Sequence, residues 1–442
     1  MKVLSGILFV INATVLSLVA NSGYQIQESA GIWWMALLAL IFVCITVYFP
    51  RRKYLGKRFL LCAYGNRCLR LFLFTTIITV VYQVVMAFVV MEGSWKNRLI
   101  SIAIAIFVEA FIFWIGIIAV YGTSTQLGIK TRTLGAVCGM VPLINIVMLG
   151  KIIRTTSKEV AFEWEKAILN EKRKGDKVCA TKYPLLMVHG VFFRDYKKFS
   201  YWGRITKELI SNGATIYYGE HQSALSVEDS GAEIAKRVKE IVESTGCEKV
   251  NIIAHSKGGV DSRMAIFAHD LEPYVASLTT INSPHRGCKF ADYLLNIMPE
   301  GIKNKVVVGY NGAMKKLGDT NPDFMAAVKD LTSERATYLD SIMTTPKNVF
   351  CQSVGSKIDK VTNGKFPLNF SYVLVKHFDG YNDGLVGVES FEWGDKYIFL
   401  NDEYGRGLSH GDVIDLNREN IQGFDVREWY VSLVEDLKKR GY

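Results

Sequence analysis

Residues 249–259 read Lys-Val-Asn-Ile-Ile-Ala-His-Ser-Lys-Gly-Gly, a short apolar run that ends at a serine between small residues. This follows the pattern Gly-x-Ser-x-Gly, in which the residues two before and two after the serine must be small because the chain turns sharply from a strand into a helix. Ala254 and Gly258 are those small residues here. The segment therefore predicts a strand, a tight turn that presents Ser256, and a helix after it.

Apolar runs and amphipathic segments alternate on both sides of this turn. Further strands are predicted at 183–188, 214–218 and 396–400, with helices at about 200–211 and 228–245. Such alternation predicts an α/β fold with a mostly parallel sheet flanked by helices. Residues 284–342 depart from it and leave room for a helical lid over an apolar pocket.

A serine hydroxyl is a weak nucleophile, so it needs a neighbouring base and donors for the oxyanion. In folds with this turn, the donors are the backbone N–H after the nucleophile and one from the loop after an earlier strand. They would be Lys257 and Val191, the second in the run His189-Gly190-Val191 after the first predicted strand.

The base and the acid follow from chain order, in which the acid precedes the histidine. The sequence has seven histidines, at 189, 221, 255, 269, 285, 377 and 410. Asp383, in a polar turn, is the preferred acid, with Asp379 second and Asp359 third. Only His410 lies after Asp383, so it is the predicted base, and His285 is assigned to shaping a loop.

Five segments of the chain resemble bacterial triacylglycerol lipases of the α/β-hydrolase superfamily. They are Leu185–Phe193, Asn251–Gly259, Thr279–Gly287, Asn382–Val386 and the tail around His410. The resemblance covers residues 181–442 and implies an ester hydrolase with a Ser256, Asp383, His410 triad. The chain departs from those lipases at Ala254, where they carry glycine, and in residues 1–180, which they lack.

The resemblance also bears on metals. In those secreted lipases an aspartate shortly after the catalytic histidine helps to bind a structural calcium, and Asp412 matches that place. The sequence offers no partner ligand for Asp412, so we expect neither a metal nor another cofactor.

Residues 1–150 are apolar and basic, with 12 Lys and Arg but only three acidic residues. Four apolar runs, at 3–20, 31–49, 71–91 and 99–121, approach or exceed the length that crosses a bilayer. The loop after the second run is rich in Lys and Arg and residues 21–30 have none, which predicts both termini on the cytoplasmic side.

Residues 136–150 are short for a span, so we expect a re-entrant or interfacial segment there. The predicted organisation is a transmembrane domain at 1–150, a charged helical linker at 151–180 and the hydrolase domain at 181–442. Glu109 lies within the fourth run, and we expect it to be hydrogen-bonded to Gln83 or to another helix.

Composition narrows the class of protein. The net charge of +10 is concentrated in the apolar part, which favours a membrane domain with basic flanks over a nucleic-acid-binding surface. The eight cysteines are widely separated and lack zinc-site spacing, and reduced thiols are typical of a cytoplasmic catalytic domain.

We therefore expect an integral membrane protein of a bacterial-type cell membrane, with a cytoplasmic serine hydrolase that cleaves carboxylic esters of lipids through an acyl-serine intermediate. Two alternatives stay open. One is a phospholipase or acyltransferase with the same triad, and the other is a non-catalytic membrane scaffold with a hydrolase fold. The sequence makes no prediction of the oligomeric state.

Overall fold

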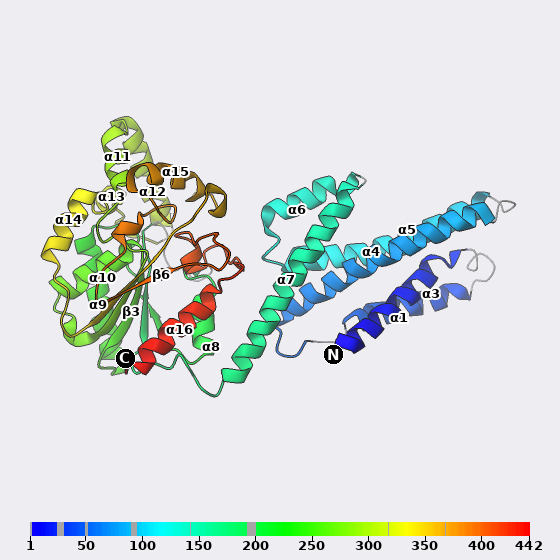
Figure 1. The fold of residues 1–442 in the computed structure, drawn as a ribbon, viewed down its shortest axis with the longest axis horizontal. Coiled ribbons are helices and arrows are strands. Elements are labelled where there is room, and N and C mark those ends of the chain that lie inside the picture. The colour runs from blue at the N-terminus through cyan, green and yellow to red at the C-terminus, as the bar shows by residue number, and fades with distance from the viewer. Residues whose placement is uncertain are drawn as a thin grey trace. The chain divides into compact units, whose positions relative to one another are not determined.

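The computed structural model describes residues 2–23, 31–48, 52–89, 95–141, 143–191, 200–316, 318–366 and 368–442. They form two compact units, Met1–Lys172 and Arg173–Tyr442, which Figure 1 shows as a helical unit and a unit with a central sheet.

The described residues of the N-terminal unit form helices joined by short loops. Its helices are α1 (Lys2–Ala20), α3 (Ile32–Tyr48), α4 (Lys57–Val89), α5 (Trp95–Thr123), α6 (Gly128–Val137) and α7 (Ile144–Arg173). The helices α1, α4 and α5 are long and apolar enough to cross a membrane, whereas α3 is a shorter apolar helix of 17 residues. The four predicted apolar runs thus lie on four helices, of which three reach the length of a span.

The packing of this unit suits a lipid surrounding. Large apolar side chains point outward, including Trp34, Phe88 and Phe107, each more than half exposed. Contact between α4 and α5 depends on Gly65 and Gly116, since a Cβ on Gly65 would lie 2.8 Å from the Gly116 carbonyl oxygen. Small residues at helix contacts are typical of membrane proteins because they let the backbones approach.

Glu109 on α5 is buried and faces α4. Its carboxylate accepts hydrogen bonds from the hydroxyls of Thr75 (2.9 Å), Thr76 (3.2 Å) and Thr79 (3.0 Å). The amide of Gln83 donates instead to Asn21 and Ser101. The hydrogen-bonding needs of Glu109 are therefore met by three threonines of the neighbouring helix.

The segment predicted as re-entrant, 136–150, contains the end of α6, a 3-10 turn at Cys138–Met140 and the start of α7. Val141 is extended (φ −96°, ψ 113°), as expected for a residue that precedes a proline. Pro142 itself lies outside the described residues. Because α7 continues to Arg173, the expected charged linker at 151–180 begins inside a helix.

The C-terminal unit contains a six-stranded parallel sheet. Its strands are β1 (Leu185–Val188), β2 (Ile216–Tyr218), β3 (Val250–His255), β4 (Val275–Ile281), β5 (Phe350–Ser356) and β6 (Lys396–Leu400), in the order β2-β1-β3-β4-β5-β6. The predicted α/β class is confirmed. No strand was predicted at β5, whose sequence Phe-Cys-Gln-Ser-Val-Gly-Ser is unusually polar for a buried strand.

Helices cover both faces of this sheet, so central strands such as β1 and β3 are apolar on both sides. They include α8 (Ile205–Ser211) and α16 (Val426–Lys439) on one face, and α9 (Val227–Thr245) and α10 (Lys257–Ala268) on the other. Met187 and Ile253 pack toward α16, whereas the adjacent Leu186 and Ile252 pack toward α9.

Four helices lie between β4 and β5, and one lies between β5 and β6. They are α11 (Lys289–Ile297), α12 (Glu300–Lys316), α13 (Phe324–Lys329), α14 (Ser333–Ile342) and α15 (Leu368–Asp379). Figure 1 shows α11 and α15 beyond one end of the sheet. The helices α11, α12, α13 and α14 occupy the segment 284–342, in which a helical lid was predicted; residue 317 lies outside the described residues.

Candidate active site

Ser256 sits on a strained turn between β3 and α10. Its backbone has φ 56° and ψ −134°, a conformation that L-residues rarely adopt. The turn is tightly enclosed, since a Cβ on Gly258 would lie 2.3 Å from the His189 carbonyl oxygen, and one on Gly259 would lie 2.1 Å from Ser283 Oγ. The packing of two neighbouring loops therefore requires a residue without a side chain at Gly258, one of the two small positions predicted, and at Gly259.

The loop after β1 lies directly against this turn. A Cβ on Gly190 would be 2.7 Å from the Cβ of Ser256, so the chain entering Val191 passes beside the serine. The Gly190 N–H donates to the Tyr201 hydroxyl (3.0 Å), which also lies 2.6 Å from Nδ1 of His255. This contact joins the loop of one predicted oxyanion donor, Val191, to the turn of the other, Lys257.

The predicted acid and base are hydrogen-bonded to one another. His410 Nδ1 lies 2.6 Å from Asp383 Oδ2, and the His410 backbone N–H donates to the Asp383 carbonyl (2.9 Å). The other carboxylate oxygen, Oδ1, accepts from the N–H groups of Leu385 and Val386. An acceptor at Nδ1 fixes the imidazole tautomer that leaves Nε2 able to take a proton.

The other acid candidates lie in other environments. The carboxylate of Asp379 accepts from the backbone N–H groups of Lys289 and Phe290 at the start of α11, and burial raises its pKa. The carboxylate of Asp359 pairs with Lys357 at 3.5 Å near the surface. Of the three candidates, Asp383 is the one in contact with His410.

The base lies close to the turn of the nucleophile. The ring centroid of His410 is 4.4 Å from that of His255, the residue that precedes Ser256. Among the described residues no hydrogen bond joins Ser256 Oγ to His410. Catalytic hydrogen bonds are often long before substrate binds, so this spacing suits a site that tightens in the complex.

Comparison with known proteins finds lipases similar to the C-terminal unit. The triacylglycerol lipases of Pseudarthrobacter phenanthrenivorans and Burkholderia plantarii are each 36% identical to the chain over 179 residues, which is 37% of this chain and 54% and 49% of those proteins. Triacylglycerol lipase 2 of Saccharomyces cerevisiae is 25% identical over 260 residues, 55% of this chain and 74% of that protein. The C-terminal unit is thus similar in sequence to bacterial triacylglycerol lipases over part of their length.

The match is limited in extent. The chain spans about half the length of the two bacterial lipases. Among solved structures, the mature lipase BlEst2 of Bacillus licheniformis is 22% identical (TM-score 0.42, 57% of this chain and 92% of that chain), and the lipase of Staphylococcus hyicus is 17% identical (TM-score 0.47, 59% and 97%). No family model matches the chain.

Asn282 and Ser356 are site residues of the hydrolase unit that the sequence analysis missed. The Asn282 amide donates to Asp383 Oδ2 (2.6 Å) and to Ser356 Oγ (2.8 Å), and the Ser356 hydroxyl donates to the Leu408 carbonyl (2.9 Å). They tie the ends of β4 and β5 to the loops that carry the acid and the base. Their position at the carboxyl ends of parallel strands, where ligand sites of α/β sheets lie, was the available signal.

The side chain of Lys257 points away from the reaction centre. Its ammonium donates to Asp261 (2.6 Å) and Ser230 (3.2 Å), and both ends of the ion pair are buried. Burial raises the pKa of Asp261 to about 7, although the Lys257 charge opposes this shift. What Lys257 can offer an oxyanion is therefore its backbone N–H, at the positive end of α10.

Two further histidines have structural partners. His189 stacks on His221, with ring centroids 3.9 Å apart, and lies 3.1 Å from the His221 carbonyl oxygen. His285, assigned to loop shaping, receives a hydrogen bond from Arg263 at Nδ1 (3.1 Å) and lies 2.9 Å from the Thr280 hydroxyl through Nε2.

Asp412 does not fit a calcium site. Its Oδ2 accepts hydrogen bonds from the Arg406 guanidinium (2.7 Å) and from the Ser409 N–H (2.9 Å), so a protein cation already neutralises it. No group of three or more His, Cys, Asp or Glu side chains placed to hold a metal ion occurs in the described part of the chain.

The buried histidines predict how the stability of the hydrolase unit depends on pH. Burial lowers the pKa of His255 and of His285 well below the usual value, helped by His410 in the first case and Arg263 in the second. Between pH 7 and 5 the unfolded chain binds protons at these rings and the folded unit does not. The unfolding free energy should therefore fall by up to about 1.4 kcal/mol per pH unit for each histidine.

Denaturant unfolding of the full-length protein at a series of pH values would measure this slope. His285→Gln should flatten it, because glutamine does not titrate, whereas His377→Gln, at an exposed histidine on α15, serves as the matched control. Identical slopes for the parent and His285→Gln would contradict this prediction, because they would show that His285 binds protons equally in the folded and unfolded states.

Proposed function

We propose that the chain is a membrane-anchored serine hydrolase that cleaves carboxylic esters of lipids through an acyl-serine intermediate. The observation that carries this proposal is the convergence of the strained Ser256 turn with the hydrogen-bonded His410–Asp383 pair. The relatives named triacylglycerol lipases support an ester of a lipid as the substrate.

In the proposed reaction, Ser256 Oγ attacks the ester carbonyl carbon while His410 Nε2 takes the hydroxyl proton. The N–H groups of Val191 and Lys257 stabilise the oxyanion, and Asp383 stabilises the imidazolium. The tetrahedral intermediate collapses to the acyl-serine, and the departing alcohol receives the proton from His410. A water molecule, activated by the same histidine, then releases the fatty acid.

Exposed apolar side chains on the helices that lie between β4 and β6 support a lipid substrate over a small soluble ester. Val308 on α12 is 72% exposed, and Phe370 on α15 is 71% exposed. Side chains of this kind can contact a membrane or an apolar ligand.

Variants of the triad test the proposal directly. Ser256→Ala should abolish ester hydrolysis and labelling by a fluorophosphonate probe. Asp383→Asn should lower kcat by about 10³–10⁴-fold, because the tautomer of His410 is no longer held. Asp379→Asn is the matched control and should retain the parent kcat, since its carboxylate lies away from His410. Activity with both Ser256→Ala and His410→Ala, or no labelling of folded parent protein at Ser256, would reject the mechanism and favour a scaffold.

We further propose that the hydrolase needs no calcium, since Arg406 supplies the positive charge beside Asp412. A chelator should leave kcat unchanged. Arg406→Ala should destabilise the unit by about 1–3 kcal/mol, because it leaves a buried carboxylate without its charged donor. Arg406→Lys should recover part of that loss, as the charge remains. Inactivation by the chelator that added calcium reverses would contradict this proposal.

The hydrolase unit is proposed to face the cytoplasm. The basic loop before α4 and the free cysteines support this side. A phosphatase that is active only after export, fused after Tyr442, should be inactive, whereas a green fluorescent protein at the same point should fluoresce. A phosphatase fusion truncated after Gly23 is the control and should be active. Strong phosphatase activity of the Tyr442 fusion would place the hydrolase outside.

A further inference from the structure

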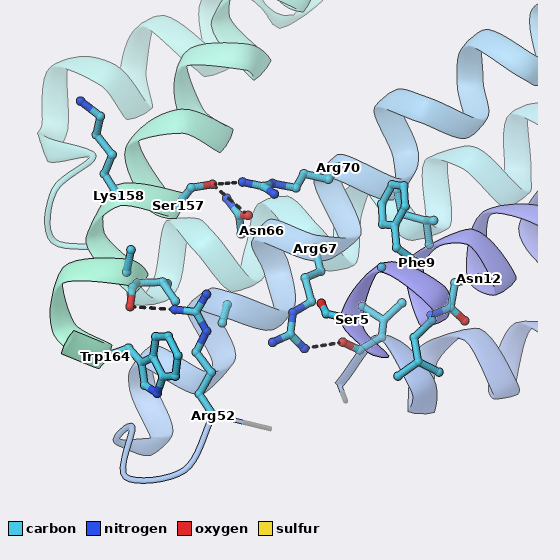
Figure 2. Close-up of a pocket in the computed structure, with 17 residues that line it drawn as sticks. Ser5, Phe9, Asn12, Arg52, Asn66, Arg67, Arg70, Ser157, Lys158 and Trp164 are labelled. Carbon is cyan, nitrogen blue, oxygen red and sulfur yellow. Dashed lines mark hydrogen bonds between the residues drawn. The ribbon is translucent and has the colours of Figure 1, made fainter. Parts of the chain in front are cut away.

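The N-terminal unit contains a cavity of about 730 Å³ at one end of its apolar helices (Figure 2). It lies between the start of α1, the end of α3, the first turns of α4 and the middle of α7. The wall is mixed: apolar side chains such as Phe9, Leu71 and Val160 lie beside four cations, Arg52, Arg67, Arg70 and Lys158. None of its described lining residues is acidic.

Neutral groups hold these cations in place. The Arg52 guanidinium donates to the Val160 carbonyl (3.1 Å) and lies 4.8 Å from the centre of the Trp164 ring. Arg67 donates to the carbonyls of Val47 and Tyr48 at the end of α3, and Arg70 donates to Ser157 Oγ (2.7 Å). Figure 2 shows the three arginines reaching into the space between α1, α4 and α7.

Three of these four cations lack a salt bridge among the residues that the structure describes. Within the described chain, neither Arg52, Arg70 nor Lys158 forms a salt bridge. Burial and the charge of Arg70 lower the pKa of Arg52, while Glu165 opposes this shift. A guanidinium has five N–H donors, and Arg52 and Arg70 each use one of them in the contacts above.

The depth of the cavity follows from helix length. In α4, Arg70 is the last charged residue, and the uncharged stretch Leu71–Val89 is about as long as a bilayer core requires. Arg67 and Arg70 therefore lie at the boundary between hydrocarbon and headgroups if the apolar helices are inserted. At this depth in the bilayer, an anionic group belongs to a lipid headgroup and carries acyl chains. Basic pockets between helices on the cytoplasmic side suit such headgroups.

We propose that this cavity binds the phosphate group of an anionic phospholipid, with its acyl chains along the apolar wall. Arg52, Arg70 and Lys158 contact the phosphate oxygens, since paired guanidinium donors match that group. Apolar residues of α1 and α4 contact the chains. The inference rests on membrane insertion of the helices and is independent of the activity at Ser256.

Full-length Ser256→Ala protein in a neutral detergent is the test system, because added lipid is then not consumed. The midpoint of thermal unfolding is followed while dioleoylphosphatidylglycerol, dioleoylphosphatidylcholine or glycerol phosphate is added. We expect a saturable rise with phosphatidylglycerol alone. Arg52→Gln or Arg70→Gln should weaken its apparent Kd by about ten-fold, the effect of losing one charge-assisted hydrogen bond.

Arg154→Gln is the matched control, since Arg154 is an exposed arginine on α7 outside the cavity; it should respond like the parent. Arg70→Lys should recover part of the affinity. If an arginine variant does not fold, Lys158→Gln carries the test, because this exposed lysine makes no hydrogen bond or ion pair within the described residues. A parent-like response of the cavity variants, or an equal response to phosphatidylcholine, would overturn the proposal. An equal response to glycerol phosphate would replace the lipid by a soluble phosphate ester.

Discussion

The hydrolase unit depends on a backbone constraint at one residue, the positive φ of Ser256. Such a conformation persists only when the surroundings over-determine it. Here two loops meet the turn: Gly190 brings the chain after β1 against the serine, Gly258 packs on the His189 carbonyl of the same loop, and Gly259 packs on Ser283 after β4. The conformation of Ser256 is therefore fixed by packing against the loops that follow two neighbouring strands of β3.

A second constraint, hydrogen bonding among buried polar groups, aligns the remaining parts. Asn282, at the end of β4, reaches both Asp383 and Ser356, and Ser356 reaches the loop that carries His410. Each of these residues is buried, so a missing partner would be costly. The acid and base loops, which are far apart in the chain, are thereby held to adjacent strand ends.

The sequence predicted local structure well where few residue types can satisfy a steric or chemical requirement. The small residues around Ser256 indicated the turn, and chain order separated His410 from the other six histidines. It failed where contacts are long-range: the bond between Asn282 and Asp383 spans 101 positions, and nothing local marks either partner. The polar strand β5 was missed for a related reason, since Gln352 and Ser353 find their partners on Thr279 and Trp393.

In the N-terminal unit, too, the sequence predicted local structure but not long-range contacts. Apolar length predicted the helices, yet the three threonines that satisfy Glu109 became visible only when α4 and α5 were placed together. Helix lengths could not give the cation cavity either, because its residues come from four helices and one loop. The basic residues after the second apolar run predicted the orientation of the helices in the membrane. The structure shows in addition that some of these residues line one cavity.

The buried cations of the C-terminal unit and those of the cavity have different partners. In the hydrolase unit, poorly exposed cations meet carboxylates: Lys257 meets Asp261, Arg263 meets Asp340 and Arg406 meets Asp412. Removing a cation from water costs free energy unless an anion compensates its charge. In these three pairs a carboxylate of the same unit provides that compensation. In the cavity of the N-terminal unit, the Arg52 guanidinium contacts a carbonyl and an indole ring among the described residues and lies beside a second arginine. Like charges gathered in an apolar setting repel each other, and an anion from outside the chain is the component that would balance them.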